Sequence, residues 1–303
     1  MNESISVIIV SYNCKQYLED CIKSIILTCY EQIPEIIVVD NNSTDGTVDY
    51  ITNLYPDVKI IINQVNKGYA YAINKGVSIS SSNYLILSNA DIVYKKHCIY
   101  GLVEKVKNFE NKIIVSPQQV FSNGNYQRSF GYIPSIKRGL FDLFGITRLK
   151  LALKKKSFEK GIKKDFKVEY LDGAVICTTK LIFNHLDGFD ESFFFYSEEA
   201  DFCFRARNVG YESLLTPEYQ VIHHRGGSQE NKGMNEESIK MLIESEARFL
   251  DKHYNPINKK IYLRLELIFF QLLLVLSKTT NDTTRTENNT KYIKAIKSVL
   301  NGN

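Results

Sequence analysis

Tryptophan is absent from this chain of 303 residues, so flat aromatic binding surfaces have to use its 19 tyrosines and 17 phenylalanines. No apolar run reaches the roughly 18 residues of a membrane span; the nearest, 267–276, is broken by Gln271. The six cysteines form no CxxC pair, which disfavours a thiolate zinc site and is typical of a protein from a reducing compartment. The N-terminus lacks a basic segment before its short apolar run, so it predicts a first strand rather than a signal peptide.

Four motifs of common enzyme classes are also missing. The chain contains no GxxxxGK[ST], GxGxxG, GxSxG or HExxH pattern. Their absence argues against a P-loop nucleotidase, a dinucleotide oxidoreductase, an α/β-hydrolase and a zinc protease. The apolar share of 44% and the charged share of 24% are those of an ordinary globular protein, which excludes a collagen-like or wholly disordered chain.

Positive charge is concentrated in one segment. The formal net charge is only +4, too small to make a nucleic acid the expected partner. Residues 137–167 hold eleven Lys and Arg against three acids, a net of +8, which leaves −4 for the rest. Because leucines and phenylalanines alternate with these charges, the segment and the helix around 261–276 favour contact with an anionic membrane surface.

Two other interpretations of the basic segment stay open. It can form a solvated lid, with the C-terminal helix packed on the core or on a second copy of the chain in a homodimer. It can also bind nucleic acid, although no recognisable nucleic-acid module accompanies it.

The first 116 residues alternate between two hydrophobic periods. Apolar, β-branched runs predict strands at 5–10, 36–39, 58–62, 84–87 and 113–115, and helical spacing predicts helices at 15–28, 47–55, 69–79 and 99–109. This alternation predicts an α/β fold with a mostly parallel sheet flanked by helices. Right-handed crossovers bring the loops after the strands to one edge, where open α/β sheets bind ligands. We therefore expect the polar clusters at 11–13, 40–46 and 88–91 to converge.

The remainder of the chain is less regular. Glycines, a proline and a lysine run predict a mobile or partly helical excursion at 118–165. Further elements are then expected: strands at 168–177 and 220–224, helices at 180–186, 198–209, 236–254 and 259–278, and a polar loop at 279–290. Two domains are predicted: 1–230, with a basic insertion at about 128–166, and a C-terminal helical extension at 231–303.

Polar residues follow several of the predicted strands. Asp40 comes directly after IIVV, where it can accept a hydrogen bond from a pyrimidine ring N–H or close a turn that caps the next helix. Asp91 follows YLIL, with Asn89 before it, and can hold Mg²⁺ or Mn²⁺ on a diphosphate or cap the next helix. His223 and His224 end another strand, and alternation allows one of them at most to ligate a metal.

Three acids open the predicted helix at 198–209. Glu198, Glu199 and Asp201 follow the aromatic run FFFY, and a helix N-terminus stabilises acids whatever their function. One of them beside a substrate hydroxyl can act as a general base. Because helical spacing points the three in different directions, one or two are expected to be structural.

Seven segments, taken in this order, resemble the family 2 glycosyltransferases of the GT-A fold, and within them the bacterial rhamnosyltransferase-like group. The segments are VIIVSYN (7–13), IIVVDNNSTDGT (36–47), NKGYAYAINKG (66–76), LILSNAD (85–91), DGAVICTTK (172–180), LDGFDESFFFYSEEADFCFRARNVGY (186–211) and HHRGGS (223–228). The resemblance covers most of residues 5–228. It implies a GT-A, Rossmann-like α/β fold with a mostly parallel central sheet and a C-terminal helical extension.

The resemblance also implies an activity. It is that of an inverting transferase which moves a sugar from dTDP-rhamnose or a UDP-sugar to a hydroxyl of a glycan or lipid-linked glycan, with Mn²⁺ or Mg²⁺ as cofactor. Cell-surface polysaccharide synthesis is the expected process. The expected location is the cytoplasm, with attachment to the inner face of the plasma membrane, and nucleic acid is not an expected partner.

Individual residues receive roles from the same resemblance. Asp40 matches the position that recognises the pyrimidine, Asp91 the last acid of the DxD-type metal motif, and His223 a histidine that helps bind metal or diphosphate. Glu199 matches the second acid of the ED pair, the general base, with Glu198 and Asp201 as alternatives. The remaining implied positions are Ser11, Tyr12, Asn13, Asn42, Asn66, Gly68, Asn74, Asn89 and Ala90 on the donor side, and Gly173 and Ala174 on the acceptor side.

Two positions depart from the family pattern. Asn89 stands where the first acid of the DxD motif is expected, which leaves fewer carboxylates for the metal. Glu199 stands where Asp is usual and is one methylene longer. These departures motivate an alternative hypothesis, a catalytically degenerate GT-A domain that binds nucleotide or glycan without turnover.

Overall fold

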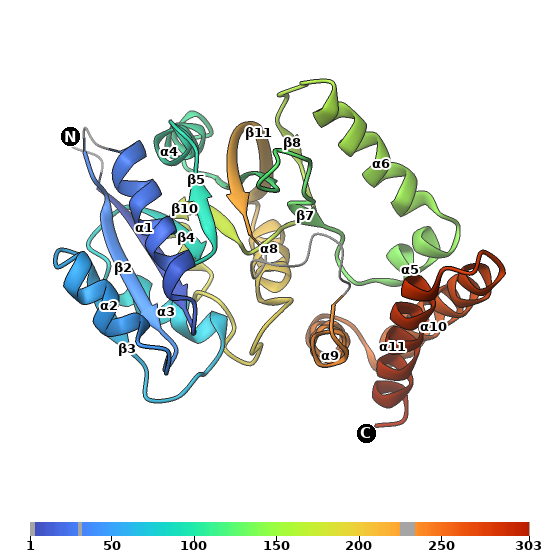
Figure 1. Ribbon diagram of the computed structural model, residues 1–303. Coiled ribbons are helices and arrows are strands. Elements are labelled where there is room, and N and C mark those ends of the chain that lie inside the picture. The colour runs from blue at the N-terminus through green and yellow to red at the C-terminus, as the bar shows by residue number, and fades with distance from the viewer. Residues whose placement is uncertain (1–3, 30–31, 225–233, 303) are drawn as a thin grey trace. The chain divides into compact units, whose positions relative to one another are not determined.

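The computed structural model describes residues 4–29, 32–224 and 234–302 (Figure 1). These residues fold into two compact units. The first unit falls within Met1–Gly131, Phe158–Phe194 and Glu198–Ser228, and the second within Tyr132–Ser157, Phe195–Ser197 and Gln229–Asn303.

One large sheet forms the centre of the first unit. Its strands among the described residues are β1 (Ile5–Ser11), β2 (Glu35–Asp40), β3 (Lys59–Ile62), β4 (Tyr84–Asn89), β5 (Ile92–Tyr94), β6 (Ile113–Val120), β8 (Phe166–Lys167), β10 (Val175–Thr179) and β11 (Glu212–His223). They follow the order β3-β2-β1-β4-β10-β6-β11-β5, with β8 paired to β11. The pairs among β1 to β4 and the β6–β11 pair are parallel, while β10 runs antiparallel between β4 and β6. The predicted mostly parallel α/β sheet is confirmed.

Helices cover both faces of this sheet. They are α1 (Lys15–Thr28), α2 (Thr47–Leu54), α3 (Tyr69–Ile79), α4 (Cys98–Asn108), α7 (Lys180–His185) and α8 (Glu198–Asn208). Val7 and Ile9 belong to the core that includes α1 and α4, whereas Ile8 faces α3 on the opposite side. Because both faces are covered, β1 is apolar on both sides over residues 7–10, and Val7, Ile8 and Ile9 are fully buried. Gly76 lets α3 approach, since a Cβ there would lie 2.4 Å from Cγ2 of Ile8.

The predicted convergence of the polar clusters is confirmed at the carboxyl ends of β1, β2 and β4. The backbone N–H of Asn13 donates to the Ser43 hydroxyl, and the N–H of Thr44 donates to Oδ1 of Asn13, both at 2.8 Å. The third cluster is adjacent, because Val10 of β1 pairs with Asn89 of β4. Parallel neighbouring strands end at the same edge, which places all three clusters there.

Part of the central segment differs from the prediction. The expected strand at 168–177 is divided: β9 (Tyr170–Leu171) pairs with β7 (Phe130–Gly131) in a second small sheet, and β10 begins only at Val175. The turn between β9 and β10 contains Gly173 and interrupts the apolar run that favoured one strand. β11 also begins earlier than predicted, at Glu212, and crosses a register shift before its last residues.

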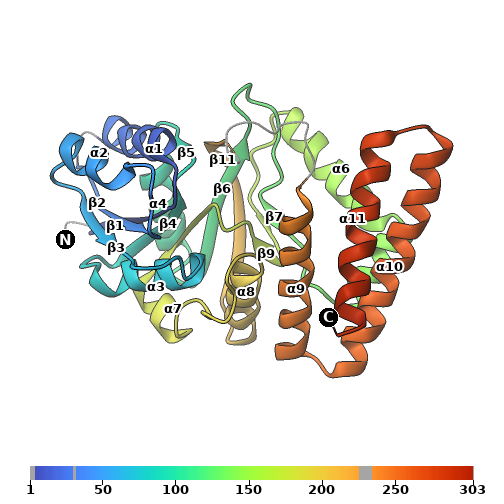
Figure 2. The same ribbon diagram turned by 60° about the horizontal axis from the view of Figure 1, so that its bottom comes forward.

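The second unit is helical. It contains α5 (Ile136–Leu143), most of α6 (Ile146–Glu159), α9 (Glu236–His253), α10 (Pro256–Thr279) and α11 (Thr283–Leu300), of which α9, α10 and α11 pack together (Figure 2). The excursion expected at 118–165 is thus partly helical, as predicted, and residues 132–157 group with the C-terminal helices. The predicted boundary at 230/231 lies outside the described residues, as do residues 225–228 of the HHRGGS segment.

The loop predicted at 279–290 is wrong, because α11 begins at Thr283. The Thr- and Asn-rich composition has low helix propensity, which favoured a loop. The Asp282 side chain caps the helix by accepting the N–H of Arg285 at 2.9 Å. Ala295 and Ile296 then bury against α9 and α10. Tertiary packing of one helical face outweighs the local propensity.

All six cysteines are free thiols, and five of them are buried. Burial raises the pKa of Cys14, the half-buried one, and raises that of Cys203 to about 11.

Among the described residues, no helix combines the length and apolar character that a membrane crossing requires.

Candidate active site

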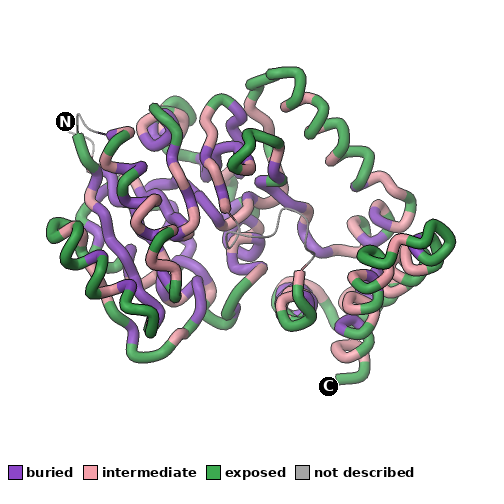
Figure 3. Tube along the Cα trace, viewed as in Figure 1, coloured by how far each residue is buried: buried purple, intermediate pink, exposed green. Residues whose placement is uncertain are grey.

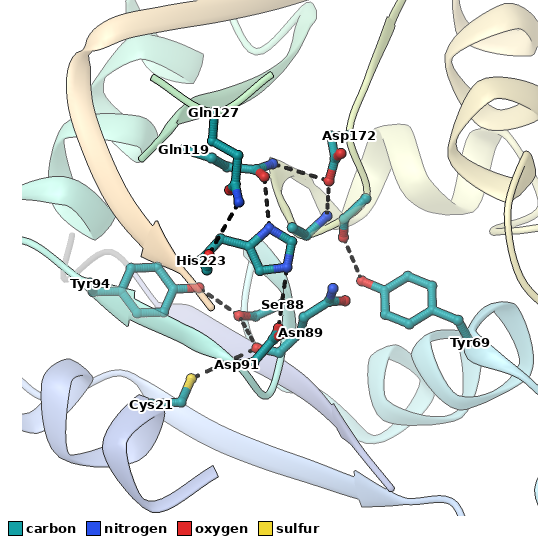
Figure 4. Close-up of polar contacts among 12 residues, drawn as sticks. Cys21, Tyr69, Ser88, Asn89, Asp91, Tyr94, Gln119, Gln127, Asp172 and His223 are labelled. Carbon is teal, nitrogen blue, oxygen red and sulfur yellow. Dashed lines mark hydrogen bonds and ion pairs between the residues drawn. The ribbon is translucent and has the colours of Figure 1, made fainter. Parts of the chain in front are cut away.

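Two residues that the sequence assigned to one site meet at the end of β11. His223 is the last residue of β11 and pairs with Ile92 of β5, so Asp91, which precedes Ile92, lies beside it. Nε2 of His223 is 3.3 Å from Oδ1 of Asp91 (Figure 4). Only 8% of the His223 side chain and 18% of the Asp91 side chain are exposed. The strand register therefore forms a partly shielded imidazole–carboxylate pair.

The neighbouring His224 is placed differently. Its backbone N–H donates to the Asp91 carbonyl at 3.0 Å, and its ring lies 5.6 Å from the ring of Tyr17 between centroids. Its Nδ1 is 3.3 Å from the Ser122 hydroxyl. Of the two histidines, His223 alone turns Nε2 toward the Asp91 carboxylate, as the alternation predicted.

A chain of hydrogen bonds continues from His223 to a second acid. Nδ1 of His223 is 2.8 Å from Oε1 of Gln119 in β6. Nε2 of Gln119 donates to Oδ1 of Asp172 at 3.1 Å, and the same oxygen accepts the N–H of Ala174 at 3.1 Å. Figure 4 shows Gln119 between the imidazole and the carboxylate. The sequence did not single out Gln119, because a lone glutamine inside a strand carries no local signal; Asp172 lay in a matching segment without an assigned role.

The first turn of α8 supplies a buried acid pair. Oε2 of Glu198 and Oε2 of Glu199 are both buried without a hydrogen-bond partner among the described residues. Burial raises the pKa of Glu198 to about 7, and the Asp172 charge adds to the effect. Burial raises the pKa of Glu199 well above its usual range, helped by Glu198 and Asp172. These acids therefore hold protons more tightly than ordinary carboxyl groups do.

Two further residues adjoin this acid cluster. The Tyr69 hydroxyl donates to the Gly173 carbonyl at 2.9 Å, and burial together with the Glu198 and Glu199 charges raises its pKa well above the usual value. A Cβ at Gly173 would lie 3.7 Å from Cβ of Glu199, so the glycine borders the acid pair directly. Tyr69 was not predicted, since a tyrosine in an apolar helix is ordinary core.

Asp201 does not join the acid cluster. Its Oδ2 accepts a hydrogen bond from Nε of Arg205 at 2.7 Å and the residue is fully buried. Arg205 also donates to the carbonyls of Leu186 and Gly188. Asp201 thus fixes Arg205, which connects α8 to the preceding turn, in accord with the expectation that one or two of the three acids are structural.

The carboxylate of Asp40 closes a turn at the end of β2. Oδ2 accepts the backbone N–H of Ser43 at 2.7 Å, and Oδ1 accepts the Ser43 hydroxyl at 2.5 Å. These bonds fix the orientation of a side chain that is almost fully buried. A carboxylate has about four acceptor positions, so two bonds leave capacity for a ligand N–H.

Most of the residues assigned to the donor side surround this turn. Asn41 links the clusters, because its Nδ2 donates to the Gly68 carbonyl at 3.1 Å and its Oδ1 accepts from Asn63 at 2.8 Å. Oδ1 of Asn66 accepts the N–H of Gly68 at 2.9 Å. Asn13 and Asn42 have left-handed backbones, Ser11 is buried and Tyr12 is exposed. Ser11 to Asn13, Asp40 to Asn42 and Asn66 to Gly68 thus form one polar edge.

Asn74 has a different environment. Its Nδ2 donates to the Phe189 carbonyl at 2.8 Å and to Glu191 at 2.9 Å, while its Oδ1 accepts the N–H of Phe189 at 2.9 Å. Both ends of the amide are therefore used in holding the 188–191 segment against α3. Its assignment to the donor stays a prediction.

The Asp91–His223 pair offers two ligand atoms for a divalent cation. Within the described part of the chain, no group of three or more His, Cys, Asp or Glu residues is arranged to hold a metal. Carboxylate oxygen and imidazole nitrogen suit Mn²⁺, and Mg²⁺-type sites commonly combine one or two carboxylates with substrate phosphates and water. The two protein ligands therefore fit a cation whose remaining positions water or the phosphates of a substrate would fill.

This fold, with its acid-lined sheet edge, is that of a GT-A glycosyltransferase. The crystal structure of GalNAc-T7 with UDP, GalNAc and Mn²⁺ matches 87% of this chain and 51% of that one, with a TM-score of 0.63 and 16% identity. The chain thus spans about half of that protein. The predicted GT-A fold is confirmed.

The family is established by sequence. The family described as Glycosyl transferase family 2 matches residues 6–171, and the chain belongs to it. A relative from Mycobacterium tuberculosis, named N-acetylglucosaminyl-diphospho-decaprenol L-rhamnosyltransferase, is 24% identical over 75% of this chain and 78% of its own length. A low-salt glycan biosynthesis hexosyltransferase from Haloferax volcanii is 24% identical over 90% of this chain and 83% of its own. The predicted family resemblance is confirmed.

Proposed function

We propose that this protein is an inverting glycosyltransferase which transfers a sugar from a dTDP- or UDP-sugar to a hydroxyl of a glycan or lipid-linked glycan. The observation that carries the proposal is the buried Glu198–Glu199 pair, which has raised pKa values and lies beside Asp172. Perturbed carboxyl groups of this kind cluster where proton transfer is needed. The name of the mycobacterial relative supports rhamnose and a lipid-linked acceptor, and that of the haloarchaeal relative supports a hexose.

Each part of the site has a role in this reaction. Glu199 removes the proton from the acceptor hydroxyl. The oxygen of that hydroxyl forms a bond to the anomeric carbon of the donor sugar while the bond from this carbon to the diphosphate breaks on the opposite side. Gly173 leaves room for the acceptor beside Glu199, with Ala174 next to it. Asp40 accepts the N–H of the pyrimidine from an orientation that Ser43 fixes. Asp91 and His223 would hold Mn²⁺ or Mg²⁺, which would supply positive charge beside the departing diphosphate.

Nucleotide binding is expected to raise the melting temperature, and to do so more strongly with Mn²⁺. A ligand at a hundred times its Kd stabilises the native state by about 2.7 kcal/mol. The measurement is a thermal-shift panel of dTDP, UDP and their sugars with and without the metal. Asp91→Ala is expected to lose the Mn²⁺-dependent increment and to reduce metal-dependent transfer, and Asp40→Ala is expected to lose most of the nucleotide response.

Ser43→Ala provides the milder comparison for Asp40, because it removes the hydroxyl that bonds the carboxylate and the Asn13 N–H but keeps the carboxylate and its bond to the Ser43 N–H. It is expected to keep most of the nucleotide response. An Asp91→Ala variant that retains the full Mn²⁺ increment would contradict the metal assignment. Nucleotide binding without any sugar transfer would instead favour the degenerate domain.

We further propose that the helical unit binds the anionic inner surface of the membrane. The exposed side of α10 carries an apolar stripe at helical spacing: Ile257, Ile261, Ile268, Leu272 and Val275. Its exposed charges are the positive Lys260, Arg264 and Lys278, because its one acid, Glu266, is buried. Exposed apolar residues between positive charges are the pattern of helices that lie on anionic lipid.

Helix α6 adds a second surface of the same kind. Leu149 and Leu153 are each about 60% exposed, at 61% and 59%. Much of α6 has the colour of exposed residues in Figure 3, and the exposed Lys150, Lys155 and Lys156 lie on this helix. Charge complementarity thus favours anionic lipid over a neutral surface or a basic partner.

The protein is expected to sediment at low salt with phosphatidylserine-containing vesicles and not with phosphatidylcholine vesicles. Leu272→Glu combined with Val275→Glu is expected to weaken this binding at least about 10-fold. The change replaces two apolar side chains that contact the lipid with two negative charges that anionic lipid repels. Leu181→Glu is the control, since Leu181 is 73% exposed in the first unit. Absence of wild-type sedimentation would remove the proposal. If the α10 variant changed the mass of the particle in solution instead, the stripe would be a homodimer interface.

A further inference from the structure

Gln119 is held firmly at the centre of the sheet. The residue is fully buried in β6, opposite Val221 of β11. Its N–H donates to the Ser129 hydroxyl at 2.8 Å, and its carbonyl accepts from Nε2 of Gln118 at 2.7 Å and the N–H of Gln127 at 3.2 Å. The backbone thus leaves the Gln119 side chain little freedom between its two polar neighbours.

Asp172 and His223 determine the orientation of the Gln119 side-chain amide, that is, which neighbour its NH₂ group faces and which its oxygen faces. A carboxylate accepts hydrogen bonds, so the NH₂ group faces Asp172, whose Oδ1 also accepts from Ala174. The amide oxygen then faces Nδ1 of His223 at 2.8 Å. An amide oxygen has no proton to donate, so the proton in this bond belongs to Nδ1.

The hydrogen bond to Gln119 has a consequence at the other ring nitrogen. A neutral imidazole that carries its proton on Nδ1 presents a lone pair at Nε2. This lone pair lies 3.3 Å from Oδ1 of Asp91, also an acceptor. Two acceptors facing each other suit a cation between them. With the proton on Nε2, His223 would instead donate to Asp91 and occupy both ligand atoms.

We infer that Gln119 is a positioning residue that holds His223 in the Nδ1–H tautomer and so keeps the Asp91–His223 pair available to a divalent cation. The same amide binds Asp172, which lies beside the Glu198–Glu199 pair. One side chain therefore connects the cation side of the site to the acid side. The consequence for sugar transfer rests on the proposed function; the tautomer and the metal affinity do not.

The tautomer is measured directly by long-range ¹H–¹⁵N NMR on protein with ¹⁵N-labelled histidine, at about pH 8 and without metal. His223 is assigned by its absence in a His223→Asn variant, among the 5 histidines of the chain. The expected result is a proton on Nδ1 and none on Nε2. In Gln119→Leu the proton is expected to move to Nε2. Gln127→Leu is the control, because Gln127 is equally buried but bonds the His223 carbonyl, at 3.2 Å, rather than the ring.

The second readout is binding of Mn²⁺ alone, followed by electron paramagnetic resonance. Loss of a partner behind a ligating histidine typically weakens metal binding by about 10- to 100-fold, which is the loss expected for Gln119→Leu and not for Gln127→Leu. A proton on Nε2 in the wild-type protein would overturn the inference, even if Gln119→Leu failed to fold. Unchanged Mn²⁺ affinity in a folded Gln119→Leu protein would overturn it as well. If both readouts hold and no sugar transfer occurs, the proposed function fails and the positioning role stands.

Discussion

Glu199→Gln is expected to reduce sugar transfer by about 10²- to 10⁴-fold, the usual contribution of a general base, while nucleotide binding is kept. The amide keeps the shape of the side chain but cannot take the acceptor proton. Initial rates at saturating donor, alongside the thermal response to nucleotide, separate the two effects. Normal transfer by this variant would refute the assignment of Glu199.

Glu198→Gln is the matched comparison, since both acids are buried and each has an Oε2 without a hydrogen-bond partner among the described residues. A larger loss with Glu198→Gln would move the base to Glu198. Asp201 is a poor candidate for the role, because Arg205 engages its carboxylate at 2.7 Å.

The pH dependence follows from the same acid pair. The pKa of Glu198 in the folded protein is about 7, above its ordinary value of 4.5, so between these values the native state binds more protons than the unfolded state. The free energy of unfolding therefore falls as pH rises through this window. The base works only when deprotonated, so transfer is expected to rise with pH over the same range and above it.

Glu199→Gln is consequently expected to melt at a higher temperature than the wild type at about pH 8, with a smaller difference at about pH 4. The Glu199→Gln variant lacks one of the two buried acids whose ionisation destabilises the folded protein as pH rises. Melting curves at both pH values test this. A variant that is less stable than the wild type at the higher pH would show that the Glu199 charge is compensated in the native protein.

Gly68→Ala is expected to destabilise the first unit by about 2–5 kcal/mol, the combined scale of a strained backbone and an overpacked contact. Gly68 has a φ of +90°, and a Cβ there would lie 2.2 Å from the Phe194 carbonyl oxygen. That oxygen accepts the N–H of Tyr69 at 3.0 Å, and the carbonyl of Gly68 accepts from Asn41 at 3.1 Å. Neither backbone segment can withdraw without breaking a hydrogen bond.

Gly124→Ala separates the two causes of this loss. Gly124 also has a positive φ, of +82°, but nothing lies within 4 Å of a Cβ built there. It is expected to cost about 1 kcal/mol, the backbone effect alone. Denaturant midpoints of both variants are the measurement. Equal losses would mean that the Phe194 segment relaxes away from the added methyl group.

The elements that the sequence predicted well are those whose pattern is imposed by burial on both sides. Strands β1, β2 and β4 each have an apolar central run, at 7–10, 36–39 and 85–87, and their predicted bounds differ from the observed ones by two residues at most. Helix α11 depends on partners far away in the sequence. Its first half has no apolar period of its own; the residues that pack on α9 and α10 lie in its second half, and the Asp282 cap fixes its start.

The candidate site divides in the same way. Asp91, His223 and Glu199 could be found because strand ends and helix starts are marked in the sequence and because whole segments match a family. Gln119 and Tyr69 could not be found, since each looks like ordinary interior sequence. Gln119 reaches the candidate site through strand register, and Tyr69 through its hydrogen bond to Gly173; both contacts exist only in the folded chain.

Because the native thiols are largely buried, they are expected to react slowly with thiol-specific labelling reagents. Alkylating reagents attack the thiolate, and burial with raised pKa values suppresses that form at the native cysteines. A cysteine introduced at exposed Leu181 of the first unit and another at exposed Leu153 of the second would react far faster than any of the six. A donor and an acceptor dye at these two positions can therefore report the distance between the units during turnover, without prior removal of a single native cysteine.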